Sequence, residues 1–137
     1  EFFTEITDNA WQGIKVNLDD RSVHVIDGNG KYLQAEMLSQ GAKEQLYLSL
    51  RLAHIKNRSL TKRPLPILMD DILVNFDERR IRNTAKVLDL MVQETLDLYN
   101  NQQILFYTCH ERTAKILQEI VQGTKIYRVQ DKKIYAE

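Results

Sequence analysis

The sequence predicts an α/β fold with a parallel βαβ core and antiparallel additions at both ends. Two short apolar runs, residues 67–69 and 103–108, are typical of strands buried in a parallel sheet. Segments with helical periodicity lie before, between and after these runs. Such alternation implies right-handed crossovers between parallel strands. Period-two patterns in the first third and at the end of the chain indicate the antiparallel additions.

The strands expected at the two ends alternate apolar and polar residues between turn residues. Asp27-Gly28-Asn29-Gly30 supplies a turn whose glycines can adopt positive φ, and Asp131-Lys132 marks the turn of a final hairpin. The predicted strands cover residues 13–18, 23–26 and 31–35 near the N-terminus, and 125–129 and 133–135 near the C-terminus.

Three helices are predicted from apolar periodicity. Residues 42–56 carry apolar positions around most of the helix circumference, which indicates burial on several sides. Residues 78–98 carry one apolar stripe and form a long amphipathic helix. The third helix covers residues 111–121, and Gly123 follows where C-cap glycines lie.

The composition is that of one globular domain over residues 1–137. Hydrophobic residues make up 43% and charged residues 28%, which argues against disorder. Lys plus Arg and Asp plus Glu each total 19, so nucleic acid or an acidic membrane could bind only through a local patch. The single cysteine suits a reducing compartment, and no apolar run approaches the roughly 20 residues that span a bilayer. We expect a cytoplasmic protein without membrane contact and, because the chain begins without Met, a piece of a longer one.

The first chemical motif is Leu38-Ser39-Gln40-Gly41, directly before the helix predicted over residues 42–56. The free backbone amides and positive dipole end of a helix start can hold an anion, and the Ser39 hydroxyl could add a donor. Alternatively, Ser39 is only an N-cap, worth about 1 kcal/mol. The motif alone leaves both interpretations open.

The second motif places Asp70 and Asp71 at the carboxyl end of a predicted parallel strand, where α/β sheets bind ligands. A Mg²⁺ ion would give these carboxylates a partner, and one of them could polarise an attacking water. Alternatively, Asp71 caps the following turn. Asn75-Phe76-Asp77 comes next, and Asp77 is a candidate N-cap of the following helix.

The third motif, Thr108-Cys109-His110, ends the next apolar strand. If the two strands are neighbours, His110 would lie beside the Asp pair and within reach of a γ-phosphate; alternatively, it satisfies a nearby carbonyl. Because neighbours on a strand point to opposite faces, Cys109 and His110 are not expected to meet. With His24 and His54 far away in the sequence, no zinc site is expected either.

In this order the motifs resemble the C-terminal lobe of ABC-type ATPase heads, which have a P-loop NTPase fold. The segments 38–53, 70–77 and 104–110 are most similar to the YhaN-type branch of the SMC, RecN and SbcC ATPases. The motifs run from Leu38 to His110, and the N-terminal strands and C-terminal hairpin also suit such a lobe.

The resemblance implies two groups of nucleotide-binding residues. Ser39, Gln40 and Gly41 form the signature motif, in which Ser39 and Gly41 would contact the γ-phosphate of ATP bound to the opposite head of a dimer. Asn75 and Asp77 would form the D-loop, which passes signals across that dimer.

The resemblance also implies the catalytic residues. Asp70 would hold Mg²⁺ through water, Asp71 would be the general base that orients the hydrolytic water, and His110 would be the switch residue on the γ-phosphate. Two positions depart from the common pattern. Asp71 stands where most members have Glu, and its side chain reaches less far; Ile72 stands where Pro is frequent.

The chain contains no Gly-x-x-x-x-Gly-Lys-Ser/Thr phosphate loop. In the family it resembles, that loop lies in an N-terminal lobe beyond a coiled coil, so the isolated chain is expected to be inactive. With its own N-terminal lobe it would bind and hydrolyse ATP as a homodimer of heads in DNA repair or processing, with DNA and an SbcD-like nuclease as partners. Alternatives are a non-catalytic dimerisation or nuclease-docking module and, less well supported, a transporter domain.

Two basic clusters could face DNA phosphates or simply form solvated surfaces. They consist of Arg79, Arg80 and Arg82 after the D-loop, and of Lys56, Arg58, Lys62 and Arg63 after the signature helix.

Overall fold

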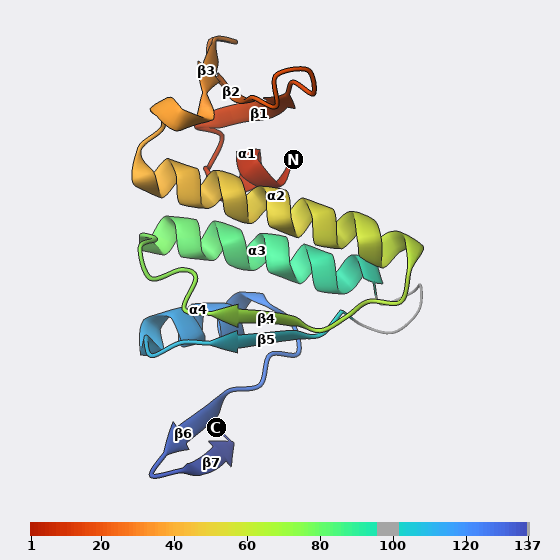
Figure 1. The fold of residues 1–137 in the computed structure, drawn as a ribbon. Coiled ribbons are helices and arrows are strands. Elements are labelled where there is room, and N and C mark those ends of the chain that lie inside the picture. The colour runs from red at the N-terminus through yellow and green to blue at the C-terminus, as the bar shows by residue number, and fades with distance from the viewer. Residues whose placement is uncertain (96–101, 137) are drawn as a thin grey trace.

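The computed structural model describes residues 1–95 and 102–136, which form a stack of layers (Figure 1). An antiparallel sheet forms one end, two long helices run through the middle, and a parallel strand pair and a projecting hairpin follow (Figure 1). The predicted α/β class is therefore confirmed. In chain order the elements are α1 (Phe2–Ile6), β1 (Trp11–Val16), β2 (Val23–Asp27), β3 (Tyr32–Gln34), η1 (Ala35–Met37), α2 (Gln40–Thr61), β4 (Ile67–Asp70), α3 (Glu78–Thr95), β5 (Ile104–Tyr107), α4 (Glu111–Ile120), β6 (Tyr127–Gln130) and β7 (Lys133–Ala136).

The N-terminal sheet has the strand order β1-β2-β3, and both pairs are antiparallel. The first strand ends at Val16, two residues earlier than expected, and Leu18 lies exposed in the following turn. The third strand is shorter than the predicted 31–35, because Ala35 begins the 3-10 helix η1. The three expected strands are otherwise present.

Helix α1 was not expected, because five residues are too few to show helical periodicity. Phe2, Phe3 and Ile6 are buried, so the helix forms through packing rather than propensity. Asp8 and Asn9 follow with positive φ, a conformation that Asp and Asn adopt more readily than most residues. The N-terminal segment is thus a short helix that packs into the core.

The long helices match the predicted segments and differ at their ends. Helix α2 begins directly after Ser39 and continues to Thr61, so it is longer than the predicted 42–56 at both ends. Helix α3 begins at Glu78 as expected, while its predicted end at residue 98 lies outside the described residues. Helix α4 ends at Ile120, and Gly123 has a positive φ of +76°.

Two hydrophobic clusters lie on either side of α2. One joins α1, α2 and the N-terminal sheet through residues such as Phe3, Val25 and Leu46. The other is larger and joins α2 and α3 to β4, β5 and α4. Because α2 contributes Leu46 to the first cluster and Leu52 to the second, its predicted burial on several sides is confirmed.

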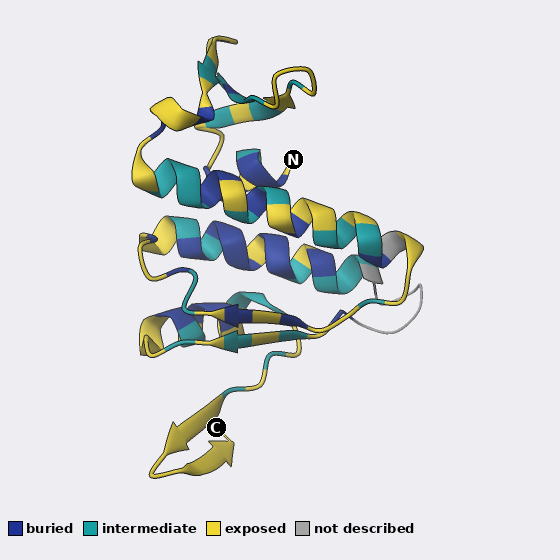
Figure 2. Ribbon diagram, in the orientation of Figure 1, coloured by how far each residue is buried: buried dark blue, intermediate teal, exposed yellow. Residues whose placement is uncertain are grey.

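Strands β4 and β5 pair in parallel with Ile67 opposite Ile104 and Asp70 opposite Tyr107. Only one face of this pair is covered: Ile67 and Met69 are buried, whereas Leu68 is 68% exposed. The expectation of strands buried on both faces is therefore wrong for the described residues. Buried and exposed residues alternate along β4, and half-buried and exposed residues alternate along β5 (Figure 2).

The hairpin of β6 and β7 extends away from the rest of the molecule, and every residue of both strands is exposed (Figure 2). Asp131 and Lys132 both have positive φ, as a two-residue type I′ turn requires. The predicted turn is therefore confirmed. In the described part of the chain no helix is both long and apolar enough to cross a membrane.

Candidate functional site

The carboxyl ends of β4 and β5 lie at the same edge of the parallel sheet. Asp70 is opposite Tyr107, and the backbone N–H of Asp71 donates to the Tyr107 carbonyl at 2.8 Å, one residue beyond β4. The starts of α2 and α3 lie at this same end of the molecule (Figure 1). The residues selected from the sequence therefore gather at one end of the fold.

Asp71 turns the chain out of the sheet. Its φ is 48°, in the left-handed region, and its carbonyl accepts a hydrogen bond from the Val74 N–H at 3.2 Å. Among residues with a Cβ, Asp and Asn adopt this conformation most readily. The backbone thus favours Asp at a position where the family pattern has Glu.

Thr108 holds the Asp71 carboxylate in place. The Thr108 hydroxyl donates to Asp71 Oδ1 at 2.8 Å and accepts a hydrogen bond from the His110 backbone N–H at 3.1 Å. His110 Nε2 lies 3.7 Å from Asp71 Oδ2. The side chains of Asp71 and His110 remain 34% and 47% exposed, so both can reach a ligand. As expected from neighbouring strands, His110 lies beside the Asp pair.

The side chains of Cys109 and His110 lie near each other, contrary to the expectation from strand alternation. Strand β5 ends at Tyr107, so Cys109 and His110 lie in the loop before α4, where strand alternation does not apply. The Cys109 thiol donates to Asp71 Oδ2 at 3.5 Å, and ligand atoms of Asp71, Cys109 and His110 all lie within 4.8 Å of one another. Three metal-ligating groups therefore converge at the strand ends.

Asp70 is exposed at the last position of β4, next to the half-buried Asp71. Carboxylate oxygens are the ligands that Mg²⁺ prefers, and exposure leaves room for the waters that Mg²⁺ usually keeps. The donor set at this edge therefore fits a Mg²⁺ ion held by Asp70 through water.

Ser39 caps α2. Its Oγ accepts a hydrogen bond from the Ala42 N–H at a long 3.4 Å, and Ser39 and Gln40 are both exposed. A hydroxyl can accept one hydrogen bond and donate another, so the cap leaves the Ser39 proton available to an anion. The two interpretations of this motif are thus compatible.

Asn75 and Asp77, which are predicted to form a D-loop, contact the two long helices. The Asn75 amide donates to the Glu44 carboxylate on α2 at 3.3 Å. Asp77 precedes α3, accepts from the Arg80 N–H at 2.9 Å and pairs with the Arg80 guanidinium at 3.3 Å. Asp77 is therefore an N-cap, as the sequence suggested, and Asn75 links the D-loop to the signature helix.

Sequence reasoning missed the supporting roles of Thr108, Cys109 and Glu44. For Thr108 and Cys109 a signal was present, because both directly follow a strand predicted to lie beside the Asp pair. No sequence signal indicated Glu44, because its contact with Asn75 depends on how α2 packs on the loop after β4.

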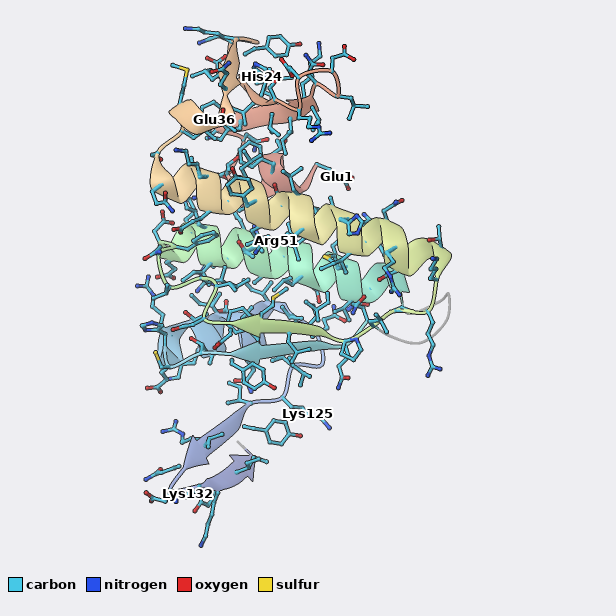
Figure 3. The ribbon with its side chains drawn as sticks, in the orientation of Figure 1. Glu1, His24, Glu36, Arg51, Lys125 and Lys132 are labelled. Carbon is cyan, nitrogen blue, oxygen red and sulfur yellow. The ribbon has the colours of Figure 1, made fainter. Side chains whose placement is uncertain are left out.

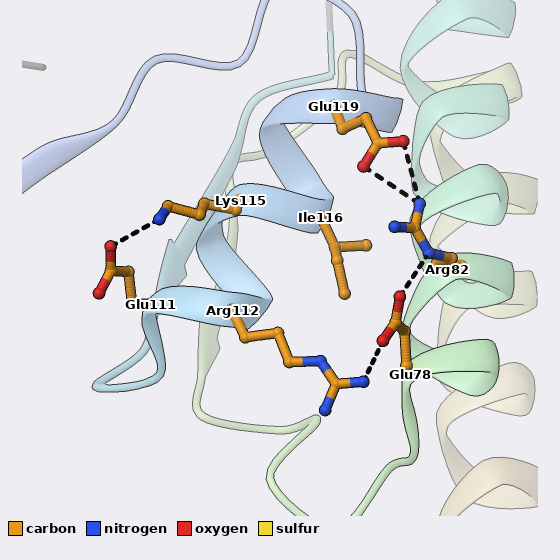
Figure 4. A pocket seen from close by; sticks show the side chains of 7 residues that line it. All are labelled: Glu78, Arg82, Glu111, Arg112, Lys115, Ile116 and Glu119. Carbon is orange, nitrogen blue, oxygen red and sulfur yellow. Dashed lines mark hydrogen bonds and ion pairs between the residues drawn. The ribbon is translucent and has the colours of Figure 1, made fainter.

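The arginines after the D-loop pair with carboxylates of this chain. Arg79 lies 2.7 Å from Asp8, and Arg82 lies 3.1 Å from both Glu78 and Glu119. Arg112 also pairs with Glu78, across a shallow depression between α3 and α4 (Figure 4).

These ion pairs change the pKa values of the groups that form them. The pKa of Glu78 is lowered mainly by a hydrogen bond from Arg112 and further by one from Arg82. A hydrogen bond from Lys115 lowers the pKa of Glu111. Hydrogen bonds to Glu119 and then Glu78 raise the pKa of Arg82. The depression in Figure 4 is therefore lined by internally balanced charges rather than by an open anion site.

Comparison with known proteins gives one similar sequence and several solved structures with a similar fold. No family model matches the chain. The uncharacterized protein YhaN of Bacillus subtilis (strain 168) is 37% identical over 111 residues, which cover 81% of this chain and 11% of that protein. The chain thus spans about a tenth of the length of this curated relative.

Solved structures give the same fold. A structure from work on ATP-driven dimerization and DNA-stimulated activation of SMC ATPases matches 99% of this chain and 81% of its own, with a TM-score of 0.65 and 16% identity. The SMC head bound to the C-winged helix domain of ScpA matches 99% and 40%, with a TM-score of 0.68 and 14% identity. The SMC head domain from Thermotoga maritima matches 99% and 43%, with a TM-score of 0.60 and 12% identity.

These findings confirm the resemblance to an SMC-like ATPase head lobe and the similarity to YhaN. At 12–16% identity, the structural matches establish the fold. The roles of individual site residues stay those that the sequence resemblance implies.

Proposed function

We propose that this chain, which has the fold of an SMC-like ATPase head, forms the C-terminal half of an ATP-hydrolysing site. The observation that carries the proposal is the position of Asp71, held by Thr108 and flanked by His110 at the carboxyl ends of two parallel strands. Ligands bind at this edge of α/β sheets, and a carboxylate fixed there can orient water for attack on a phosphate.

Each residue would contribute a separate part of the reaction. Asp70 would bind the Mg²⁺ waters, and the ion would neutralise phosphate charge. Asp71 would accept a proton from the attacking water through Oδ2, since Thr108 donates to Oδ1. His110 would hydrogen-bond the γ-phosphate. Asn75, in contact with Glu44, would connect these residues to α2.

A second lobe is needed because the phosphate loop is missing. The uncovered face of β4 and β5 exposes Leu68, Leu105 and Tyr107, which is a suitable surface for packing against the chain's own N-terminal lobe. We further propose that Ser39, Gln40 and Gly41 contact ATP on a second head in a homodimer, because the start of α2 is exposed and its hydroxyl proton is available.

Joining the chain to its N-terminal lobe and replacing Asp71 by Asn tests the central assignment. Asn tolerates the left-handed backbone of Asp71 and keeps its size, but it cannot accept a proton. We expect turnover to fall by about 10²- to 10⁴-fold with ATP binding retained.

Asp19→Asn is the matched control, because Asp19 lies exposed in the turn after β1 and undergoes the same chemical change. Equal turnover in the Asp71 and Asp19 variants would reject the proposal. The isolated chain should show no turnover above background.

One observation favours a second candidate, a non-catalytic dimerisation or nuclease-docking module. Both Asp71 oxygens already accept hydrogen bonds, from Thr108 and Cys109, and a carboxylate that kept both would be a weaker base toward water. In that case the joined head would dimerise with ATP while the Asp71→Asn variant turned over ATP as slowly as the unaltered protein.

A role in DNA repair or processing in the cytoplasm, with an SbcD-like nuclease as partner, is also proposed. The described structure favours Lys62 and Arg63 as the DNA contact, since both are exposed, over Arg79 and Arg82, which are paired with carboxylates. Replacing Lys62 and Arg63 by Gln should flatten the salt dependence of DNA binding by the joined head. An unchanged slope would reject this contact.

A further inference from the structure

We propose that Asp71, Cys109 and His110 form a binding site for a zinc-class divalent cation. The three side chains come from the ends of two neighbouring strands, and each offers a different ligand atom toward the same point. This site is distinct from a Mg²⁺ site on Asp70, because Mg²⁺ takes oxygen ligands whereas thiolate and imidazole favour zinc.

The distances fit tetrahedral coordination. With zinc–ligand bonds of about 2.0–2.3 Å and tetrahedral angles, two ligand atoms are separated by about 3.3–3.7 Å. Cys109 Sγ lies 3.5 Å from Asp71 Oδ2, and His110 Nε2 lies 3.7 Å from the same oxygen. The ligand atoms of the third pair, Cys109 and His110, lie within 4.8 Å of each other.

Neighbouring hydrogen bonds already orient the ligands. The Thr108 hydroxyl donates to Asp71 Oδ1 and leaves Oδ2 facing the other two groups. The same hydroxyl accepts from the His110 backbone N–H, which fixes the start of α4 relative to Asp71. Partners of this kind orient metal ligands and raise metal affinity by roughly 10- to 100-fold.

The site is open to solvent and has three protein ligands. Cys109 and His110 are exposed, so an ion can enter without unfolding, and water would take the fourth position. The thiol releases its proton when the ion binds, because thiolate is the ligand. His24, labelled in Figure 3, lies on the N-terminal sheet across α2 and α3 from β5 and cannot supply a fourth ligand.

The consequence for catalysis rests on the proposed function. A bound ion would occupy Asp71 Oδ2 and the His110 imidazole, the groups proposed as base and switch. Zinc would therefore stop ATP turnover while leaving the fold intact. Metal binding itself needs neither ATP nor the second lobe, so it can be tested separately.

Titration of the reduced 137-residue chain with CoCl₂ and with ZnCl₂ against a chromophoric chelator tests the site. We expect one equivalent to bind, with a thiolate-to-cobalt charge-transfer band that zinc abolishes. Cys109→Ser and His110→Asn should each weaken zinc binding by at least about 100-fold, and Thr108→Val by about 10- to 100-fold. His54→Asn, an exposed histidine of α2, should bind as the unaltered chain does.

The proposal is overturned if zinc fails to bind, if the cobalt complex lacks the thiolate band, or if the Cys109 and His110 variants bind zinc as tightly as the His54 variant. Far-UV circular dichroism of each variant shows that the comparison is between folded chains. In the joined head, the zinc concentration for half-inhibition should rise in Cys109→Ser. An unaltered head that lacks turnover would reject the proposed function and leave the metal site standing.

Discussion

The start of α2 and the ends of β4 and β5 lie at the same end of the molecule and differ in how their polar groups are held. At the start of α2, the Ser39 side chain accepts one long hydrogen bond, of 3.4 Å, from its own helix. At the strand ends, Thr108 links Asp71 to the His110 backbone through two shorter hydrogen bonds, and Cys109 adds a third contact.

The difference indicates a division of labour. A group that acts on water must be fixed to within a fraction of an ångström, and the strand ends supply that fixation from within the chain. A group that meets ATP on another head must stay accessible until the heads close. We therefore expect substitutions at the strand ends to affect the chemical step and those at the start of α2 to affect assembly.

The largest effect is expected for Ser39→Arg in the joined head. The bulky cation would block the helix start and prevent ATP-driven dimerisation, with a loss of about 100-fold or more in dimer affinity. The folding stability of the chain should change by about 1 kcal/mol or less, because only a weak cap is removed. Light scattering with and without ATP measures the first quantity, and urea unfolding measures the second. Dimerisation that survives the substitution contradicts a contact across heads.

Thr108→Val should produce a fall in turnover of about 10- to 100-fold, since misplacing a catalytic group by about 1 Å can cost 10²-fold. Valine keeps the branched shape and removes the hydroxyl that holds Asp71. ATP-driven dimerisation should be unchanged, which is the reverse of the Ser39→Arg result. Thr108→Ser keeps the hydroxyl and serves as control; equal losses in both variants would show that the hydroxyl is not what matters.

Asp71→Glu tests whether the backbone selects aspartate. At φ 48° a short Asp side chain can hydrogen-bond to the neighbouring backbone, whereas the longer Glu side chain is less suited to do so. We therefore expect a loss of about 1 kcal/mol in the free energy of unfolding. Asp71→Asn, which tolerates the same backbone, should lose less. Urea unfolding of the isolated chain checks this order. A Glu variant as stable as the unaltered chain would mean that the backbone does not explain the departure from the family pattern.

The features that could be predicted from the sequence are those that depend on residues close together in the chain. Local apolar patterns predicted the helices and the strand that the structure has within residues 42–56, 67–69 and 111–121. Asp77 was recognisable as an N-cap because capping depends only on neighbouring residues. The site's position followed from one nonlocal assumption, that the two apolar strands are neighbours.

Other features depended on tertiary contacts or on where a strand stops. Helix α1 forms only because Phe2, Phe3 and Ile6 find a core to enter. The sequence argument excluded a meeting of Cys109 with His110 because it applied strand alternation to residues beyond Tyr107, where β5 ends. The uncovered face of β4 and β5 could not be foreseen, because an apolar run does not show whether a second layer is present.

The smallest effect is expected from acid, and it separates the two regions once more. Arg112 and Arg82 hold the pKa of Glu78 below its ordinary 4.5, so this ion pairing stabilises the fold above pH 4.5 and is lost as the pH falls below that value. Glu78 and Arg112 join the first turns of α3 and α4, next to the D-loop and His110. As the pH falls below 4.5, amide hydrogen exchange should therefore rise at the start of α4 more than at the start of α2, where the Ser39 cap does not titrate. Glu78→Gln should raise exchange near α4 at neutral pH and flatten its dependence on pH below 4.5. The same acid response at both helix starts in this variant and in the unaltered chain would show that Glu78 does not tie α4 to α3.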